Sequence, residues 1–187
     1  MGENGRQGQK DQAQVIFLQV RESAFDDIVV ISKSMDFTAF DCGNDDFNDY
    51  LEHEALEDQK NHISVTYVGI AGGRPTAFVT LVAAAYRTEF LKTTVQGVHR
   101  YRQIPALKIA RIATDRTCQR QGCGEALIQH SVAIGFAVQE LIGCKLIITG
   151  ALPDKVQWYE RQGFVSTLKP EHATGRENCP MYAVLSG

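Results

Sequence analysis

The segment RTCQRQGCGEALIQHSV, residues 116–132, joins a β-like run to a long stretch with helical periodicity. Gly122 and Gly124 lie where a strand should give way to a helix. Glycine lacks the Cβ that would keep a ligand away from the backbone. A helix N-terminus adds unpaired N–H groups and about half a positive charge. This glycine turn therefore predicts a binding site for a phosphate or pyrophosphate.

Three phosphate-binding motifs were compared with the glycine turn. A dinucleotide-binding motif requires G-x-G-x-x-G/A, but Leu127 occupies the third small position. A Walker loop requires G-K-[ST], which is absent from the turn. The third motif, Q/R-x-x-G-x-G/A, matches at Gln119, Gly122 and Gly124. It is the pyrophosphate loop of acyl-CoA-dependent acetyltransferases. On this motif alone, a connection that binds nothing stays an open alternative.

The hydrophobic pattern around the turn predicts a mixed α/β domain. Residues 106–114 read as a strand, 124–142 as a helix with a broad apolar face, and 145–152 as a buried strand. Pro153 opens a short helix that Gly163 ends. Further strands are predicted at 15–20, 63–70, 76–86, 164–168 and 181–185, with a helix in 42–61. This order implies an antiparallel first half and a central βαβ unit.

Length and composition favour one domain. The chain has 187 residues, of which 44% are hydrophobic and 22% charged, enough for an ordinary core. We expect residues 1–14 to be a disordered polar tail and 15–187 a single domain. The N-terminus lacks the apolar core of a signal peptide, and no apolar run reaches the ~20 residues of a membrane helix. A net charge of −3 argues against a surface that coats nucleic acid or membrane as a whole.

Cysteine and histidine usage predicts neither disulfides nor a metal site. The cysteines are odd in number and include no C-x-x-C pair; they are Cys42, Cys118, Cys123, Cys144 and Cys179. The five histidines are scattered, with no pair at metal-binding spacing. A reduced, cytoplasmic setting without a metal is the expectation.

Two motifs in order resemble the GNAT (GCN5-related N-acetyltransferase) family over residues 108–164. The first is the glycine turn, and the second is VQWYERQGFV at 156–165, a tyrosine followed by a Gly-Phe pair. The 35 residues from Gly124 to Tyr159 leave room for one long helix and one strand. The resemblance implies the GNAT fold, a central mixed sheet with an antiparallel N-terminal half and a βαβ acyl-CoA-binding core.

The resemblance also implies direct transfer of an acetyl group from acetyl-CoA to a primary amine in a ternary complex. A strand N–H of Ile112 or Ala113 would polarise the thioester carbonyl. The cofactor-binding residues implied are Ile112, Ala113, Thr114, Gln119, Arg120, Gln121, Gly122, Cys123, Gly124 and Glu125, with the N–H groups of 119–125 on the pyrophosphate.

Tyr159 is the implied catalytic acid, since a phenol with a pKa of about 10 stays protonated at neutral pH and can donate to the leaving thiolate. The alternative is that Tyr159 and Trp158 only pack the short helix. No general base stands out, although Glu89 is a candidate. That is compatible with an α-amine acceptor, whose pKa of about 7.7 lies below the 10.4 of lysine.

Residues 40–56, 63–70 and 107–127 are similar to the acetyltransferase toxins of bacterial toxin–antitoxin modules, which acetylate the amino acid of charged tRNA. The segment 87–120 carries a net charge of +6, suited to RNA or to the phosphates of coenzyme A. The candidate partners are an amine-bearing acceptor, tRNA through segment 87–120, an antitoxin protein and a second copy of the chain. The rival functions are a housekeeping acetyltransferase and a non-catalytic acyl-CoA-binding regulatory module.

Overall fold

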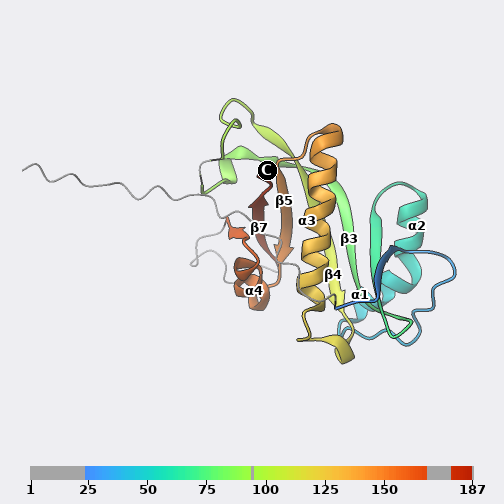
Figure 1. Cartoon of the computed structure of the whole chain (residues 1–187). Helices are drawn as coiled ribbons and strands as arrows, with labels where there is room; N and C mark the ends of the chain where they lie inside the picture. The colour runs from blue at the N-terminus through green and yellow to red at the C-terminus, as the bar shows by residue number, and fades with distance from the viewer. Residues whose placement is uncertain (1–23, 94, 168–177, 187) are drawn as a thin grey trace, which may run out of the picture.

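The computed structural model describes residues 24–93, 95–167 and 178–186. They form a seven-stranded mixed sheet in the order β1-β2-β3-β4-β5-β7-β6, shown in Figure 1. The predicted tail at 1–14 and the predicted strand at 15–20 lie outside the described residues. No helix in the described ranges is long and apolar enough to cross a membrane.

The first half of the sheet is antiparallel, as predicted. It consists of β1 (Asp27–Val30), β2 (Val65–Ala71), β3 (Arg74–Arg87) and β4 (Gln103–Thr114). Strand β1, four residues without alternating burial, was not predicted from the sequence. The predicted strands at 76–86 and 106–114 are longer in the structure, where β3 and β4 pair as far as Arg87 and Gln103. Pairing with a long neighbour extends both strands into polar sequence.

The predicted βαβ unit follows. Strand β4 leads through the glycine turn into α3 (Cys123–Ile142), and α3 leads to β5 (Leu146–Ala151), which is parallel to β4. The sheet ends with β7 (Cys179–Val184) and the two-residue β6 (Val165–Ser166), shorter than the predicted strand at 164–168.

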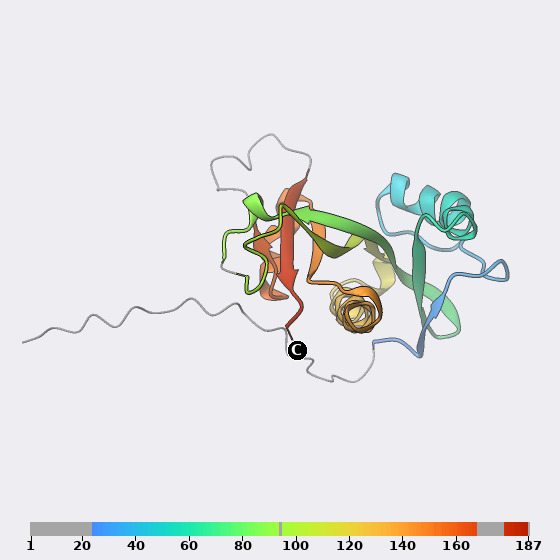
Figure 2. The ribbon, with the colours of Figure 1, turned by 90° about the horizontal axis from the view of Figure 1, so that it is seen from above.

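The sheet has a core on each face. Neighbouring residues of β3 point to opposite faces. Val79 packs in the cluster that contains Leu127 and Val132 of α3, whereas Phe78 packs in the cluster with Tyr50 and Leu51. Figures 1 and 2 accordingly show α3 and the helical segment 45–60 on opposite faces of the sheet.

The predicted helix in 42–61 is built from three pieces: α1 (Asp45–Asp49), a π-helical turn η1 (Tyr50–Glu54) and α2 (Ala55–Lys60). The Asn44 side chain caps α1 by accepting a hydrogen bond from the Phe47 N–H. After β5, the short turn η4 (Pro153–Lys155) leads into α4 (Val156–Arg161).

Candidate active site

The two central parallel strands diverge at one end and open a cavity. Strands β4 and β5 pair only from Ala106 and Leu146 to Ile109 and Thr149, although β4 continues to Thr114. The cavity has a volume of about 660 Å³ and is lined by β4 from Ile109 onward, the glycine turn, the end of β5 and α4. Its remaining wall is the segment that leads into α1, with Cys42, Asn44 and Phe47.

All but one of the predicted site residues line this cavity. The exception is Gln121, whose exposed side chain donates a hydrogen bond to the Thr117 carbonyl at 2.8 Å. Sequence analysis missed Cys42, Asn44 and Phe47 as cavity residues. They lie more than 60 residues from the glycine turn in sequence, so no local motif connects them to it.

The two glycines of the turn are required for different reasons. Gly122, the N-cap of α3, has a φ of +86°, and it supplies no capping side chain to the first N–H groups of the helix. A Cβ at Gly122 would meet no atom within 4 Å, so the constraint there is conformational. A Cβ at Gly124 would lie 3.1 Å from Cζ2 of Trp158. Gly124 thus lets α4 pack closely against the start of α3.

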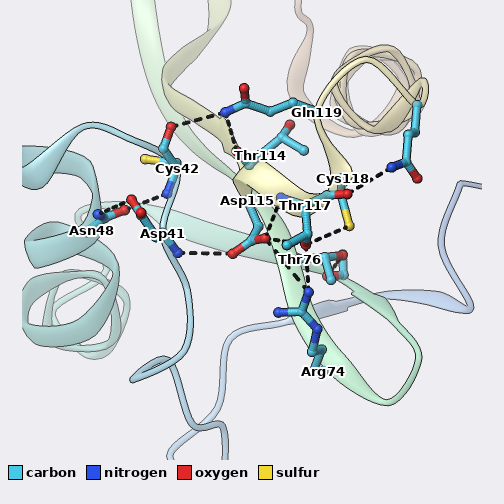
Figure 3. Close-up of polar contacts among 12 residues, drawn as sticks. Asp41, Cys42, Asn48, Arg74, Thr76, Thr114, Asp115, Thr117, Cys118 and Gln119 are labelled. Atoms are coloured by element: carbon cyan, nitrogen blue, oxygen red, sulfur yellow. Dashed lines mark hydrogen bonds and ion pairs between the residues drawn. The ribbon is translucent and has the colours of Figure 1, made fainter.

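The side chain of Gln119 contacts protein carbonyls in this structure. Its Nε2 donates to the carbonyl oxygens of Cys42 at 3.1 Å and Thr114 at 3.2 Å, as Figure 3 shows. This amide connects the segment before α1 to the end of β4. The part of Gln119 that is left to face a cofactor is therefore its backbone.

Tyr159 lies in the wall of the cavity and is only 5% exposed. Its ring makes edge-on contacts with Trp158 and Phe164, at centroid distances of 4.8 Å and 5.3 Å. Burial raises the pKa of Tyr159 above its ordinary value, and a hydrogen bond with Thr149 opposes that change only in part. The phenol is therefore protonated at neutral pH. Trp158, expected to fill the core, is the more exposed of the two rings.

The basic segment 87–120 divides into two groups. Arg111 and Arg120 line the cavity, and Arg116 pairs with Asp41 beside it. Arg87 and Arg102 lie at the other end of β4, where Arg87 pairs with Gln103 and the Arg102 carbonyl accepts from the Thr88 N–H. Lys92 and Arg100 belong to the connection that leads into that end, and Lys108 lies on β4 between the two groups. Nine residues of extended strand separate Arg102 from Arg111, about 30 Å at ~3.3 Å per residue. The sequence suggested one basic patch beside the cofactor site, and β4 holds its two halves apart.

In the described part of the chain, no carboxylate lines the α1 side of the cavity, where it could act as a base. Among the described residues that line it, Glu125 is the one carboxylate, and it belongs to the glycine turn. Glu89, the candidate from the sequence, lies outside the cavity wall, where it is 63% exposed and pairs with Arg87 at 3.3 Å. The interpretation of Glu89 as a base is not supported by its position.

Arg111 brings a positive charge to the α1 side of the cavity. Its guanidinium lies 3.7 Å from the centroid of the Tyr50 ring, a cation–π contact that orients it. Phe47, Cys42 and Asn44 line the same cavity and carry uncharged side chains. Burial raises the pKa of the Cys42 thiol, which keeps it uncharged at neutral pH.

A mixed sheet that opens over a glycine turn, with a protonated tyrosine across the opening, defines an acyl-CoA-dependent N-acetyltransferase. The chain belongs to the GNAT family, because the acetyltransferase (GNAT) domain matches residues 62–166. The protein is therefore an N-acetyltransferase that uses acetyl-CoA as its co-substrate, and the predicted fold class, family and cofactor are confirmed.

Its relatives include toxins. A tRNA-acetylating toxin of Mycobacterium tuberculosis (strain ATCC 25618 / H37Rv) is 26% identical over 127 residues, which cover 68% of this chain and 76% of the toxin. A Tyr-to-Phe mutant of KacT matches with a TM-score of 0.77 at 22% identity, over 85% of this chain and 94% of KacT. AtaT complexed with acetyl-methionyl-tRNAfMet matches with a TM-score of 0.72 at 23% identity, over 83% of this chain and 92% of AtaT.

Proposed function

We propose that this N-acetyltransferase acts on the α-amino group of the amino acid carried by charged tRNA. The observation that carries the proposal concerns the α1 side of the cavity, with Cys42, Asn44 and Phe47, where the acceptor would bind. Among the described residues, this acceptor side offers Arg111 for a phosphate and no carboxylate. A lysine acceptor would need a base to lose its proton, whereas an α-amine with a pKa of about 7.7 is partly neutral at physiological pH. The similarity to a tRNA-acetylating toxin supports the same acceptor.

Acetyl-CoA would lie between β4 and the glycine turn, with its pyrophosphate on the N–H groups at the start of α3. The AtaTR complex bound with AcCoA supports this assignment of the cofactor. The thioester carbonyl would accept a hydrogen bond from β4. The Asp115 N–H donates to Thr76 on β3, so alternation along the strand turns the Ile112 N–H toward the opening. This favours Ile112 over Ala113 as the polarising group.

The chemical step would then be direct. The neutral α-amine attacks the thioester carbon, and Tyr159 donates its phenolic proton to the departing coenzyme A thiolate as the tetrahedral intermediate collapses. The proton that the nitrogen loses on forming the amide would pass to water, and the Tyr159 phenolate would take a proton back from water. Holding both reactants in one cavity replaces a bimolecular encounter with a step between neighbours.

The test is acetylation in vitro by the purified full chain. Labelled acetyl-CoA is offered with bulk tRNA charged with all amino acids, the same tRNA uncharged, a lysine-containing peptide and spermidine. We expect label in the charged tRNA, released as N-acetyl-amino acid after base hydrolysis. Label in the peptide or in spermidine alone would overturn the tRNA acceptor while leaving the acetyltransferase intact.

A toxin role and an antitoxin partner follow from the same acceptor. Acetylated aminoacyl-tRNA cannot serve normally in translation, so expression should stop bacterial growth. One solved structure of AtaT is bound to the C-terminus of the antitoxin AtaR, and another similar structure is a KacTA–DNA complex. We expect growth arrest by the wild type and none by Tyr159→Phe. Normal growth on strong expression of active protein would count against the toxin role.

A further inference from the structure

The acceptor side and the cofactor side of the cavity are joined at one buried carboxylate. Asp115, the residue that follows β4, is 3% exposed. Its Oδ2 accepts a hydrogen bond from the Asp41 N–H at 3.0 Å, across 74 residues of sequence (Figure 3). The Arg116 N–H donates back to the Asp41 carbonyl at 2.8 Å. Asp41 is therefore bound through both of its backbone groups to the start of the glycine turn.

The carboxylate of Asp115 is itself held in place. Its Oδ1 accepts hydrogen bonds from the backbone N–H of Thr117 at 2.9 Å and from the Thr117 hydroxyl. Arg74 of β3 lies 3.8 Å from the same oxygen and donates to the Thr117 hydroxyl at 2.6 Å. With four polar groups around it, this carboxylate has one available orientation.

Asp41 in turn positions the acceptor wall. Its Oδ1 accepts from the Gly43 N–H at 2.8 Å and from the Asn48 side chain at 3.2 Å. The Asn48 side chain accepts from the Cys42 N–H at 3.0 Å. These bonds determine where α1 begins, and so where Cys42, Asn44 and Phe47 face the cavity.

We propose that Asp115 is a positioning residue for acetyl transfer: it holds the acceptor wall at a set distance from the glycine turn that binds acetyl-CoA. The amine and the thioester carbon must approach to about 3–3.5 Å, and a misplacement of about 1 Å can cost 10²-fold in rate. The proposal concerns the established transfer of acetyl from acetyl-CoA and does not depend on which amine is the acceptor.

The chain offers a matched control. Asp36 forms the same local turn as Asp115: its Oδ1 accepts from the Thr38 N–H at 3.0 Å and from the Thr38 hydroxyl at 2.8 Å. Asp36 is exposed and is not part of the cavity wall. Asp36→Asn therefore makes the same substitution in the same kind of turn without touching the connection to Asp41.

The experiment compares Asp115→Asn and Asp36→Asn with the wild type. The acceptor used is whichever of charged tRNA, lysine peptide or spermidine the wild type labels fastest. If that acceptor is not charged tRNA, the proposed function fails, but the role of Asp115 is still tested. We expect Asp115→Asn to lower kcat by about 10²-fold while the Kd for acetyl-CoA, measured by calorimetry, changes less than threefold. Asp36→Asn should match the wild type in both.

A second pair covers the case in which Asp115→Asn does not fold. Thr117→Val removes the hydroxyl that orients the carboxylate and should lower kcat without changing the Kd for acetyl-CoA, whereas Thr117→Ser should restore kcat.

Two results would overturn the proposal. One is an unchanged kcat in the Asp115 or the Thr117→Val variant. The other is a loss of kcat matched by an equal loss of acetyl-CoA binding or of folded protein, which would make Asp115 purely structural.

Discussion

The backbone of Gly124 and the indole of Trp158 lie so close that even a methyl group would press on the ring: a Cβ on Gly124 would be 3.1 Å from Cζ2 of Trp158. Gly124 is in the first turn of α3, and Trp158 precedes Tyr159 in α4. This contact connects the proposed pyrophosphate site to the helix that carries the proposed acid.

Gly124→Ala should therefore disturb the chemistry more than the fold. The new methyl gains about 0.5–1 kcal/mol of helix stability relative to glycine, but the indole must move by a few tenths of an ångström. We expect kcat to fall several-fold with the midpoint of thermal unfolding nearly unchanged. In a double-mutant cycle with Trp158→Phe the effects should be non-additive, because the two groups touch. Additive effects would show that this contact does not transmit the change.

Gly122→Ala should act through backbone conformation. A residue with a Cβ at φ +86° is destabilised by roughly 1–2 kcal/mol, and a distorted N-cap should also weaken acetyl-CoA binding. The control is Gly73→Ala, at φ +72° with open space around it, in the turn between β2 and β3. Urea unfolding should show similar losses for both variants, whereas calorimetry should show a raised Kd for Gly122→Ala alone. An equal Kd for both would remove the glycine turn from the cofactor site.

Tyr159→Phe should lower kcat by about 10²-fold or more, the usual contribution of a general acid, and spare the Kd for acetyl-CoA. The reason is the loss of the proton that the thiolate needs, with the ring packing against Phe164 retained. Steady-state kinetics with each acceptor measures it. Tyr67→Phe is the control, because that half-buried tyrosine of β2 lies outside the cavity wall. Unchanged turnover of Tyr159→Phe would reduce Tyr159 to a packing residue.

Arg111→Gln should raise the KM for charged tRNA by about tenfold or more, since a hydrogen bond to a charged group contributes about 1.5–3 kcal/mol. Arg100→Gln, at the far end of β4, should have a smaller effect, and neither should change the Kd for acetyl-CoA. Initial rates at several salt concentrations test this, because phosphate contacts weaken as salt increases. A larger effect at Arg100 would place the RNA along the distal group.

The stability of the protein should decrease below neutral pH through His130. Burial lowers the pKa of His130 below 6.5, and its Nε2 has no hydrogen-bond partner in the described part of the chain. The unfolded state therefore binds the proton first. The contribution of the neutral ring is complete above pH 6.5 and is lost as the pH falls from there toward the folded-state pKa.

The comparison is urea unfolding at pH 7.5 and pH 5.5. His130→Phe keeps an aromatic ring beside Tyr67, 4.6 Å away in the wild type, but cannot take a proton. We expect the variant to lose less unfolding free energy than the wild type between the two pH values. An equal loss in both would assign the pH dependence to other groups.

The contribution of the Asp115 carboxylate to stability changes at pH values below those tested for His130. Burial alone would raise the pKa of Asp115, but hydrogen bonds from Thr117 and Asp41 and the charge of Arg74 keep that pKa below 3.8.

Much of the fold could be predicted because its signals are local. The glycine turn, the periodicity of α3 and the hydrophobic strands on either side each lie within one short segment, and their order along the chain specifies a βαβ unit. The strand β1 could not be found this way. Four residues without alternating burial carry no pattern, and pairing with β2 is what makes them a strand.

The candidate site divides in the same way. The sequence by itself determined the glycine turn and Tyr159, since both belong to motifs whose residues are neighbours in the chain. Only the tertiary structure decided that Cys42, Asn44 and Phe47 form the opposite wall, that the basic segment is split along β4, and that Gln119 and Asp115 connect the two sides. The physical reason for the connections through Gln119 and Asp115 is that they join residues more than 70 positions apart, and such contacts exist only once the sheet has brought its strands together. The basic segment is split because β4 is extended, which moves its two ends apart.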